Sequence, residues 1–313
     1  MIHPWMIIAF SLIVGLTDAL SMPSFQSIVP SIVTREQVGR ALALNSTQFN
    51  LSRIIGPAIA GVLISAIGIT ACFAVNAASY VPFVGVALWI LPRRIPQAPQ
   101  KEALPLHRPL VQGVREIVHQ PHLRGALLTV FTTGLFCAPL VTFSPVLVQA
   151  VFHGGSSHFS AALVAFGTGG LLGGAGLLGV PTEVDPRRLS SAFALALAAI
   201  LVVTALNPWS LGLPALLFLA GASMTISNTA ANTLVQSTAV PHLLGRSVSL
   251  YMLAIRGGSA IGALLTGMTI SRLGVQHALL LDGVVAAVAH AGLARNWLSA
   301  PLPKPSAIQP PAA

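Results

Sequence analysis

The sequence predicts an all-α protein that crosses a membrane many times. Of its 313 residues, 54% are hydrophobic and only 7% are charged, whereas soluble domains carry roughly 25% charged residues. Apolar stretches of about 20 residues, the length of a spanning helix, recur along the whole chain. A stretch at residues 39–68 also returns in similar form at 245–274. These observations predict two related blocks of membrane helices.

The apolar stretches divide into nine predicted spans. They lie at about residues 4–26, 38–66, 70–91, 122–150, 158–180, 188–207, 209–236, 243–272 and 275–297. Thirteen of the sixteen Lys and Arg residues fall on alternate connections, beginning with the one after the first span. The positive-inside rule places these connections in the cytoplasm, so the N-terminus is expected outside and the C-terminus inside. Because these basic residues lie in short breaks between apolar runs and do not form one basic face, the net charge of +9 does not indicate a nucleic-acid partner.

The connection between the third and fourth spans divides the chain into domains. Its residues, "LPRRIPQAPQKEALPLHRPL", are rich in proline and charge, which is typical of a linker. We expect a partial bundle of three helices at 1–91, a cytoplasmic linker at 92–121, a six-helix bundle at 122–297 and a disordered tail at 298–313. If the blocks are duplicates, the first lacks three opening helices, and the chain is an N-terminally incomplete form of a twelve-span protein.

The repeated stretch has identical glycines at equivalent places. Gly56 corresponds to Gly262, and Gly68 corresponds to Gly274, with a constant offset along the two copies. Parallel duplication of a six-helix unit is a transporter architecture, in which two bundles enclose a central cavity. Equivalent helices in the two bundles need the same close packing, and this explains why the stretch occurs twice.

The segments "GLTDALSMPSFQSIVPSIV" and "GRALALNSTQFNLSRIIGPAIAGVLI" resemble the major facilitator superfamily. Within it they are similar to the bacterial drug-efflux and siderophore-export branch, typified by enterobactin exporters. The resemblance implies nine of the usual twelve helices of that fold and a location in the bacterial inner membrane. It also implies export of small molecules by alternating access, as a proton antiporter. A lysophospholipid or other lipid-translocating carrier and an inactive truncated remnant remain as alternatives.

Two motifs of this superfamily are matched. A cytoplasmic-loop motif, which the resemblance assigns to gating, corresponds to Gly179, Glu183, Arg187 and Arg188. An antiporter signature corresponds to Gly56, Pro57 and Gly61. Pro57 also removes a backbone donor from an apolar run, so a bend is expected there. That helix either rocks during transport or forms a static packing notch.

Polar residues within the spans are the candidate transport sites, because a charge in lipid costs at least ~2.5 kcal/mol. We expect Arg53 and Arg256 to line the substrate path, and Asp18 to carry a proton or pair with an arginine. Structural ion pairs or snorkelling to the interface would also explain these three residues. The uncharged side chains bind substrate or join helices by hydrogen bonds; they are Gln48, Asn228 and Asn232.

Other residues receive structural interpretations. Asp282 is expected at the outer interface, and His290 in the core or at the edge of a cavity. The overlapping pairs Gly169/Gly173 and Gly170/Gly174 predict close helix packing. No nucleophile–base pair, pair of catalytic carboxylates or metal-ligand cluster stands out in the sequence, so an enzyme, a metal and a cofactor are not expected. The expected partners are the lipid bilayer, a small-molecule substrate and protons.

Overall fold

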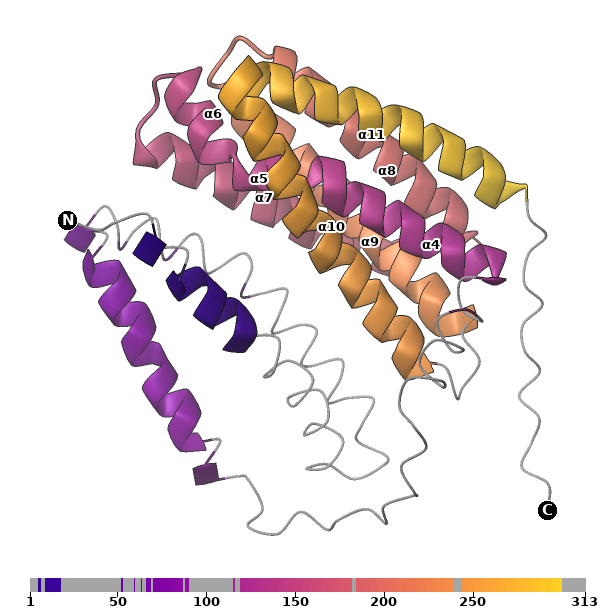
Figure 1. Cartoon of the computed structure of the whole chain (residues 1–313), viewed down its shortest axis with the longest axis horizontal. Coiled ribbons are helices and arrows are strands. Elements are labelled where there is room, and N and C mark those ends of the chain that lie inside the picture. Colours follow the sequence, from indigo (N-terminus) through magenta and orange to yellow (C-terminus); the bar gives the residue numbers. More distant parts are fainter. Residues whose placement is uncertain are drawn as a thin grey trace. The chain divides into compact units, whose positions relative to one another are not determined.

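The computed structural model (Figure 1) divides into two compact units, Met1–Ile55 and Gly56–Ala313. In the first unit, residues 9–17 are helical, within the span predicted at 4–26. In the second unit, the apolar helix Thr70–Val86 lies within the span predicted at 70–91. The structure describes residues 5–6, 9–17, 52, 59, 63, 66–68, 70–86, 88–89, 115, 119–181, 184–238 and 244–299. The span predicted at 38–66 lies almost wholly outside these residues.

After residue 120, the described residues form six helical segments long and apolar enough to cross a membrane. The six spans predicted after the linker are thus confirmed. The first segment comprises α4 (Pro121–Thr132), the π-helix η1 (Thr133–Cys137) and α5 (Pro139–Thr142), and α6 (Ser144–Ala150) follows it. The other five are α7 (Ser156–Gly176, followed by the short η2, Leu177–Gly179), α8 (Pro186–Leu206), α9 (Gly212–Thr238), α10 (Leu244–Leu273) and α11 (Val275–Leu298).

The first segment is broken, although the sequence predicted one continuous helix. Pro139 has no N–H, so the carbonyl of Leu135 loses its usual helical donor. The turn before it widens, and the Ala138 N–H donates to the Thr133 carbonyl across 3.0 Å. This spacing of five residues defines a π-turn. A second interruption follows at Phe143, whose φ of −102° and ψ of 8° lie outside the helical region.

Glycines bring α7 and α9 into backbone contact. A Cβ on Gly169 would overlap the carbonyl oxygen of Phe218, and one on Gly221 would overlap that of Phe166. A Cβ on Gly173 would stand 2.8 Å from the Ala222 backbone. Small residues permit such approaches between membrane helices. The packing predicted for the paired glycines of α7 is confirmed, with closer contact at Gly169 and Gly173.

The repeated stretch meets two definite structural needs. At Gly262, α10 passes so close to η1 that a Cβ would overlap the Leu135 carbonyl oxygen. At the end of the stretch, Gly274 has φ 80° and its counterpart Gly68 has φ 83°, a left-handed conformation that favours glycine. The Gly274 N–H donates to the Ile270 carbonyl at 2.9 Å, which caps α10. Both copies therefore end on a glycine in the same conformation.

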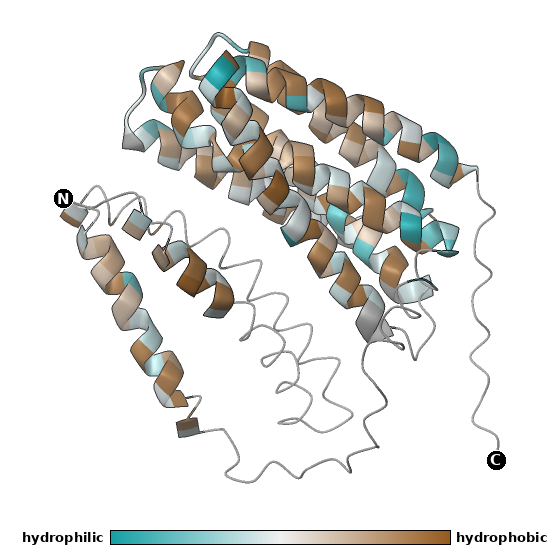
Figure 2. Cartoon of the chain, in the orientation of Figure 1, coloured by the Kyte–Doolittle hydropathy of each residue, from teal (hydrophilic) through white to brown (hydrophobic). Residues whose placement is uncertain are grey.

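Apolar side chains form the interior and most of the described surface of the bundle. Two buried clusters hold the helices together, one centred on Leu201, Leu217 and Leu279 and the other on Val130, Tyr251 and Trp297. Figure 2 shows mostly hydrophobic residues along the middle of the helices and hydrophilic ones toward several of their ends. An apolar outer surface of this kind suits contact with lipid rather than water.

Candidate functional site

Four polar residues lie on the parts of α9 and α10 that meet at a hydrogen bond, and we call this set the polar seam. It consists of Asn228 and Asn232 on α9 and Ser247 and Tyr251 on α10. The Tyr251 hydroxyl donates a 2.7 Å hydrogen bond to the Asn228 carbonyl. Asn232 and Ser247 each lie one helical turn from these residues, and the antiparallel direction of the helices places them opposite each other. The seam therefore runs through two turns of both helices.

Three oxygens of the seam are buried without a hydrogen-bond partner among the described residues. They are Asn228 Oδ1, Asn232 Oδ1 and Ser247 Oγ. A buried polar atom left in this state costs about 1–3 kcal/mol. Native structures pair almost all such groups, and unpaired ones need an explanation. The seam thus offers acceptor and donor capacity that the described part of the protein does not use.

Arg256 lies on α10 but on a different face from the seam. It follows Tyr251 by five residues, which turns its side chain about 140° around the helix. It is exposed, in a stripe with the exposed apolar residues Leu253 and Leu264. Within the described part of the chain, Arg256 forms no ion pair. The structure therefore brings the two predicted asparagines together and leaves the predicted arginine apart from them.

At the start of α8, Arg187 forms an ion pair with Asp185 of the same helix end and a hydrogen bond to the end of α11. Arg187 is 4% exposed, and its Nη2 lies 2.9 Å from Asp185 Oδ2, while its Nε lies 3.0 Å from the same oxygen. Its Nη1 donates to the Trp297 carbonyl across 3.3 Å. Asp185 also accepts from the Arg187 backbone N–H at 2.9 Å, as the N-cap of α8. We call these three residues the α8–α11 latch.

The electrostatics of the latch favour the ionised form of Asp185. Partial burial acts to raise the pKa of this carboxyl group, but the hydrogen bonds and the charge of Arg187 outweigh it. The neighbouring charge of Arg188 adds to the effect, so the pKa lies below its ordinary value of 3.8. Opposite charges and hydrogen bonds to the carboxylate both stabilise the charged form. The latch is therefore an intact ion pair at neutral pH.

Three residues of the loop motif predicted from the sequence are described: Gly179, Arg187 and Arg188. Arg187 is buried, Arg188 is exposed, and a Cβ on Gly179 would meet nothing within 4 Å. Among the described residues, Arg187 pairs with Asp185, which was not singled out from the sequence. Its signal was present, since Asp directly before Pro at the start of an apolar run is an N-cap pattern. Seven predicted site residues lie outside the described residues: Asp18, Gln48, Arg53, Gly56, Pro57, Gly61 and Glu183.

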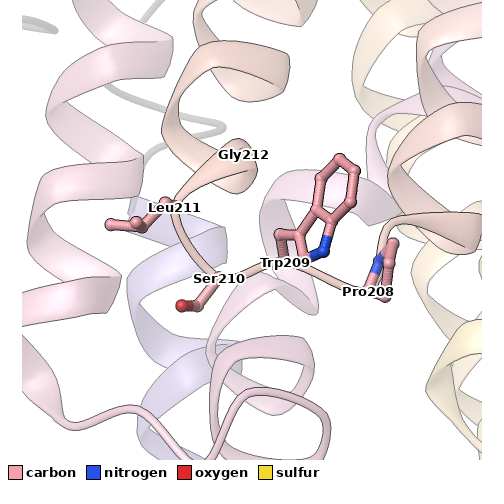
Figure 3. Close-up of a pocket in the computed structure, with 5 residues that line it drawn as sticks. All are labelled: Pro208, Trp209, Ser210, Leu211 and Gly212. Atoms are coloured by element: carbon pink, nitrogen blue, oxygen red, sulfur yellow. The ribbon is translucent and has the colours of Figure 1, made fainter.

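The loop between α8 and α9 forms a surface pocket of about 560 Å³, lined by residues 208–212. In Figure 3 the Trp209 indole and the Leu211 side chain point in different directions from this loop. These side chains are 74% and 89% exposed, and none of the five lining residues is ionisable. Exposed Trp at a span end is typical of the membrane interface. We do not consider the pocket a substrate site.

A model of the transmembrane secretion effector family, within the major facilitator superfamily, matches residues 1–308. The chain belongs to this family. It is accordingly a multi-pass membrane transporter, and its efflux-type relatives agree with this assignment. The prediction of this superfamily from the sequence is confirmed.

Named relatives of the chain include efflux and siderophore transporters. It is 26% identical over 288 residues to macrolide efflux protein A of Streptococcus pyogenes, covering 90% of this chain and 70% of that protein. It is 27% identical over 169 residues to the staphyloferrin A transporter of Staphylococcus aureus, covering 53% and 41%. A further relative is the multidrug efflux pump Tap of Mycolicibacterium fortuitum, 26% identical over 287 residues, covering 86% and 68%.

A solved structure of the same fold is also similar to the chain. It is the inward-facing, unoccupied crystal structure of a bacterial homolog of the human lysosomal transporter Spinster. The TM-score is 0.63 at 15% identity, over 88% of this chain and 74% of that one. At this identity the likeness shows the fold alone, and it agrees with the predicted helical membrane architecture.

Proposed function

We propose that the protein exports small molecules across the bacterial inner membrane by alternating access, with protons entering in exchange. Its substrates are macrolide-like drugs or siderophores, the classes named for its relatives. The distribution of basic residues supports a cytoplasmic latch, an external N-terminus and a cytoplasmic C-terminus. The names of the relatives do not favour the lipid-translocating alternative.

The observation that carries this proposal is the set of unpaired oxygens in the polar seam. The amide oxygens of Asn228 and Asn232 accept hydrogen bonds, and the Ser247 hydroxyl both donates and accepts. Macrolides and siderophores carry several hydroxyl and carbonyl groups, which are matching partners. Binding such a molecule would offset the cost of leaving these oxygens unpaired, about 1–3 kcal/mol each. The seam is therefore our proposed substrate contact in the six-helix bundle.

Arg256 has a separate role in this proposal. An arginine in a stripe of exposed apolar residues is costly if the stripe faces lipid. We assign the stripe to the substrate path, where Arg256 attracts negatively charged groups of a substrate. Asp18, Gln48 and Arg53 are proposed to act in the N-terminal bundle, and Pro57 with its flanking glycines is proposed to bend the helix that rocks. The latch is proposed to close the cytoplasmic side of the six-helix bundle.

The seam is tested by the efflux of erythromycin from cells that express the chain. Asn228→Ala and Asn232→Ala should each raise the KM roughly two- to tenfold, since a hydrogen bond contributes about 0.5–1.5 kcal/mol. Thr233→Ala is the matched control, because Thr233 lies exposed on the same helix and bonds only the Thr229 carbonyl of its own helix in the described structure. An unchanged KM in the doubly substituted protein would remove the seam from the substrate site. If the unaltered chain exports neither erythromycin nor staphyloferrin A, the proposed substrate classes are wrong.

A further inference from the structure

A carboxyl group lies buried within the six-helix bundle, between α10 and α11. Asp282 is 9% exposed, and its Oδ2 accepts a 2.6 Å hydrogen bond from Thr266 Oγ1. It follows the first residue of α11 by seven positions, so it lies about 10 Å along that span. The acid that the sequence places near the outer interface is thus covered by the protein itself. The reason is tertiary: α10 covers the side chain, and Thr266 supplies a polar partner.

The helices around Asp282 supply no cation in the part of the chain that the structure describes. On the α8 side, the adjacent Gly283 packs against Val202 and the Ala198 carbonyl. On η1, the Cys137 thiol lies near enough to Asp282 to interact electrostatically with it, and a thiol carries no positive charge. Thr266 is the neighbour on α10. The single ion pair among the described residues is the one in the latch, so Asp282 has no counter-charge there.

The remaining titratable groups of these elements lie elsewhere. His277 and Arg295 on α11 and Arg256 and Arg272 on α10 are exposed, and the two arginines of α8 lie in its first turn. His290, two turns further along α11, is buried and contacts Thr133 Oγ1 at 3.4 Å. The titratable side chains of α4 lie at its beginning, where Gly125 packs against Trp297 at the far end of α11. The described residues of α6 include no titratable side chain.

This arrangement suits a group that gains and loses a proton. A charged carboxylate without a cation is unfavourable inside a membrane, whereas a neutral carboxylic acid avoids most of that cost. The Thr266 hydroxyl is both a donor and an acceptor. It can donate to the carboxylate and accept from the O–H of the acid, so either form keeps a hydrogen bond. Uptake of one proton from water converts the carboxylate to the acid, and no other bond changes.

We propose that Asp282 and Thr266 form a proton-binding site in the six-helix bundle, through which proton entry drives export. This inference rests on the proposed exporter function and assigns its coupling ion to a definite residue. Thr266 and Tyr251 lie on the same helix, fifteen residues or about 22 Å apart. A change in charge between α10 and α11 is thereby connected to the polar seam through α10 itself.

Proton binding can be measured without any transport, by pH-difference infrared spectroscopy of the purified full chain in lipid. A C=O stretching band of a protonated carboxylic acid should appear on acidification and be lost in Asp282→Asn. It should persist in Asp185→Asn, the matched removal of a carboxyl group outside the membrane span. In Thr266→Val the band should move to higher frequency, because the acid loses a hydrogen-bond partner; this variant also serves if Asp282→Asn does not fold. If the band in Asp282→Asn and in Thr266→Val were the same as in the unaltered chain, the proposed site would be overturned.

Coupling is measured in proteoliposomes with radiolabelled erythromycin as the probe. In Asp282→Asn, stimulation of transport by a pH gradient should be lost, while exchange of labelled for unlabelled erythromycin without a gradient should remain. Stimulation that survives in this variant, or that needs Na⁺ rather than a proton gradient, would overturn the coupling role. If the unaltered chain moves no erythromycin at all, the proposed substrate class fails, and the infrared band still decides whether Asp282 binds a proton.

Discussion

An alanine at position 262 tests whether the close approach of α10 to η1 stabilises the bundle. The added Cβ would overlap the Leu135 carbonyl oxygen and stand 2.8 Å from its carbonyl carbon. Backbone atoms cannot rotate away as a side chain can, so the helices must separate. Overpacking of this kind costs about 1–3 kcal/mol. Gly262→Ala should therefore lower the free energy of unfolding by about that amount.

The matched control is Gly257→Ala, the same substitution on the same helix. A Cβ at this position would meet only Leu253 Cδ1, at 3.9 Å. Replacing a helical glycine with alanine without such a clash stabilises by about 0.5–1 kcal/mol. The two variants should thus differ by about 1.5–4 kcal/mol, the sum of the cost at one site and the gain at the other.

The difference is measured by unfolding both variants in mixed detergent micelles and following tryptophan fluorescence. Gly262→Ala should unfold at a lower denaturant concentration than the unaltered chain, and Gly257→Ala at the same or a higher one. Equal midpoints for the two variants would show that α10 does not approach η1 as closely as described. The physical account of the repeated glycine would then fail as well.

Two other substitutions, each with its own control, are measured in the same unfolding assay. Asp185→Ala removes the N-cap of α8 and the partner of Arg187, so it should cost about 0.5–2 kcal/mol, whereas Arg188→Ala, at an exposed side chain, should change little. Folding lowers the pKa of Asp185. Its contribution to the free energy of unfolding is therefore present above about pH 4 and is lost as the pH falls through the lowered pKa. Asp185→Ala should lack this pH-dependent contribution. Gly169→Ala should destabilise the α7–α9 contact by about 1–3 kcal/mol, while Gly176→Ala on α7, which meets nothing within 4 Å, should not. Equal stability of the last two variants would contradict that contact.

The helical spans could be predicted from the sequence because the solvent dictates them. In lipid, each backbone polar group must be satisfied within its own segment, so a long apolar run becomes a helix. The runs that became α8 to α11 were accordingly located to within a few residues. The break before Pro139 was not predicted. Periodicity reports which residues are apolar, whereas the widened turn depends on which carbonyl loses its donor.

The candidate site was less predictable than the spans. Asn228 and Asn232 were singled out because polar residues are costly in a span, and this reasoning needs no partner. Tyr251 and Ser247 were missed, since their proximity to α9 depends on how two helices align. Asp185 was missed because the superfamily motif directed attention to Glu183, although the N-cap pattern lay two residues further on. Asp282 was expected at the outer membrane interface. Its burial depends on contact with α10, which the sequence does not reveal.

Composition and the order of apolar runs were sufficient for the membrane, the helices and the doubling of the stretch that ends at Gly68 and Gly274. These properties follow from local chemistry, since each residue meets lipid or water according to its own side chain. The pairing of Arg187 with Asp185 and Trp297, and of Asp282 with Thr266, required the folded arrangement. Contacts between helices depend on crossing geometry and on close fit at a few glycines, which residues distant in the chain establish together.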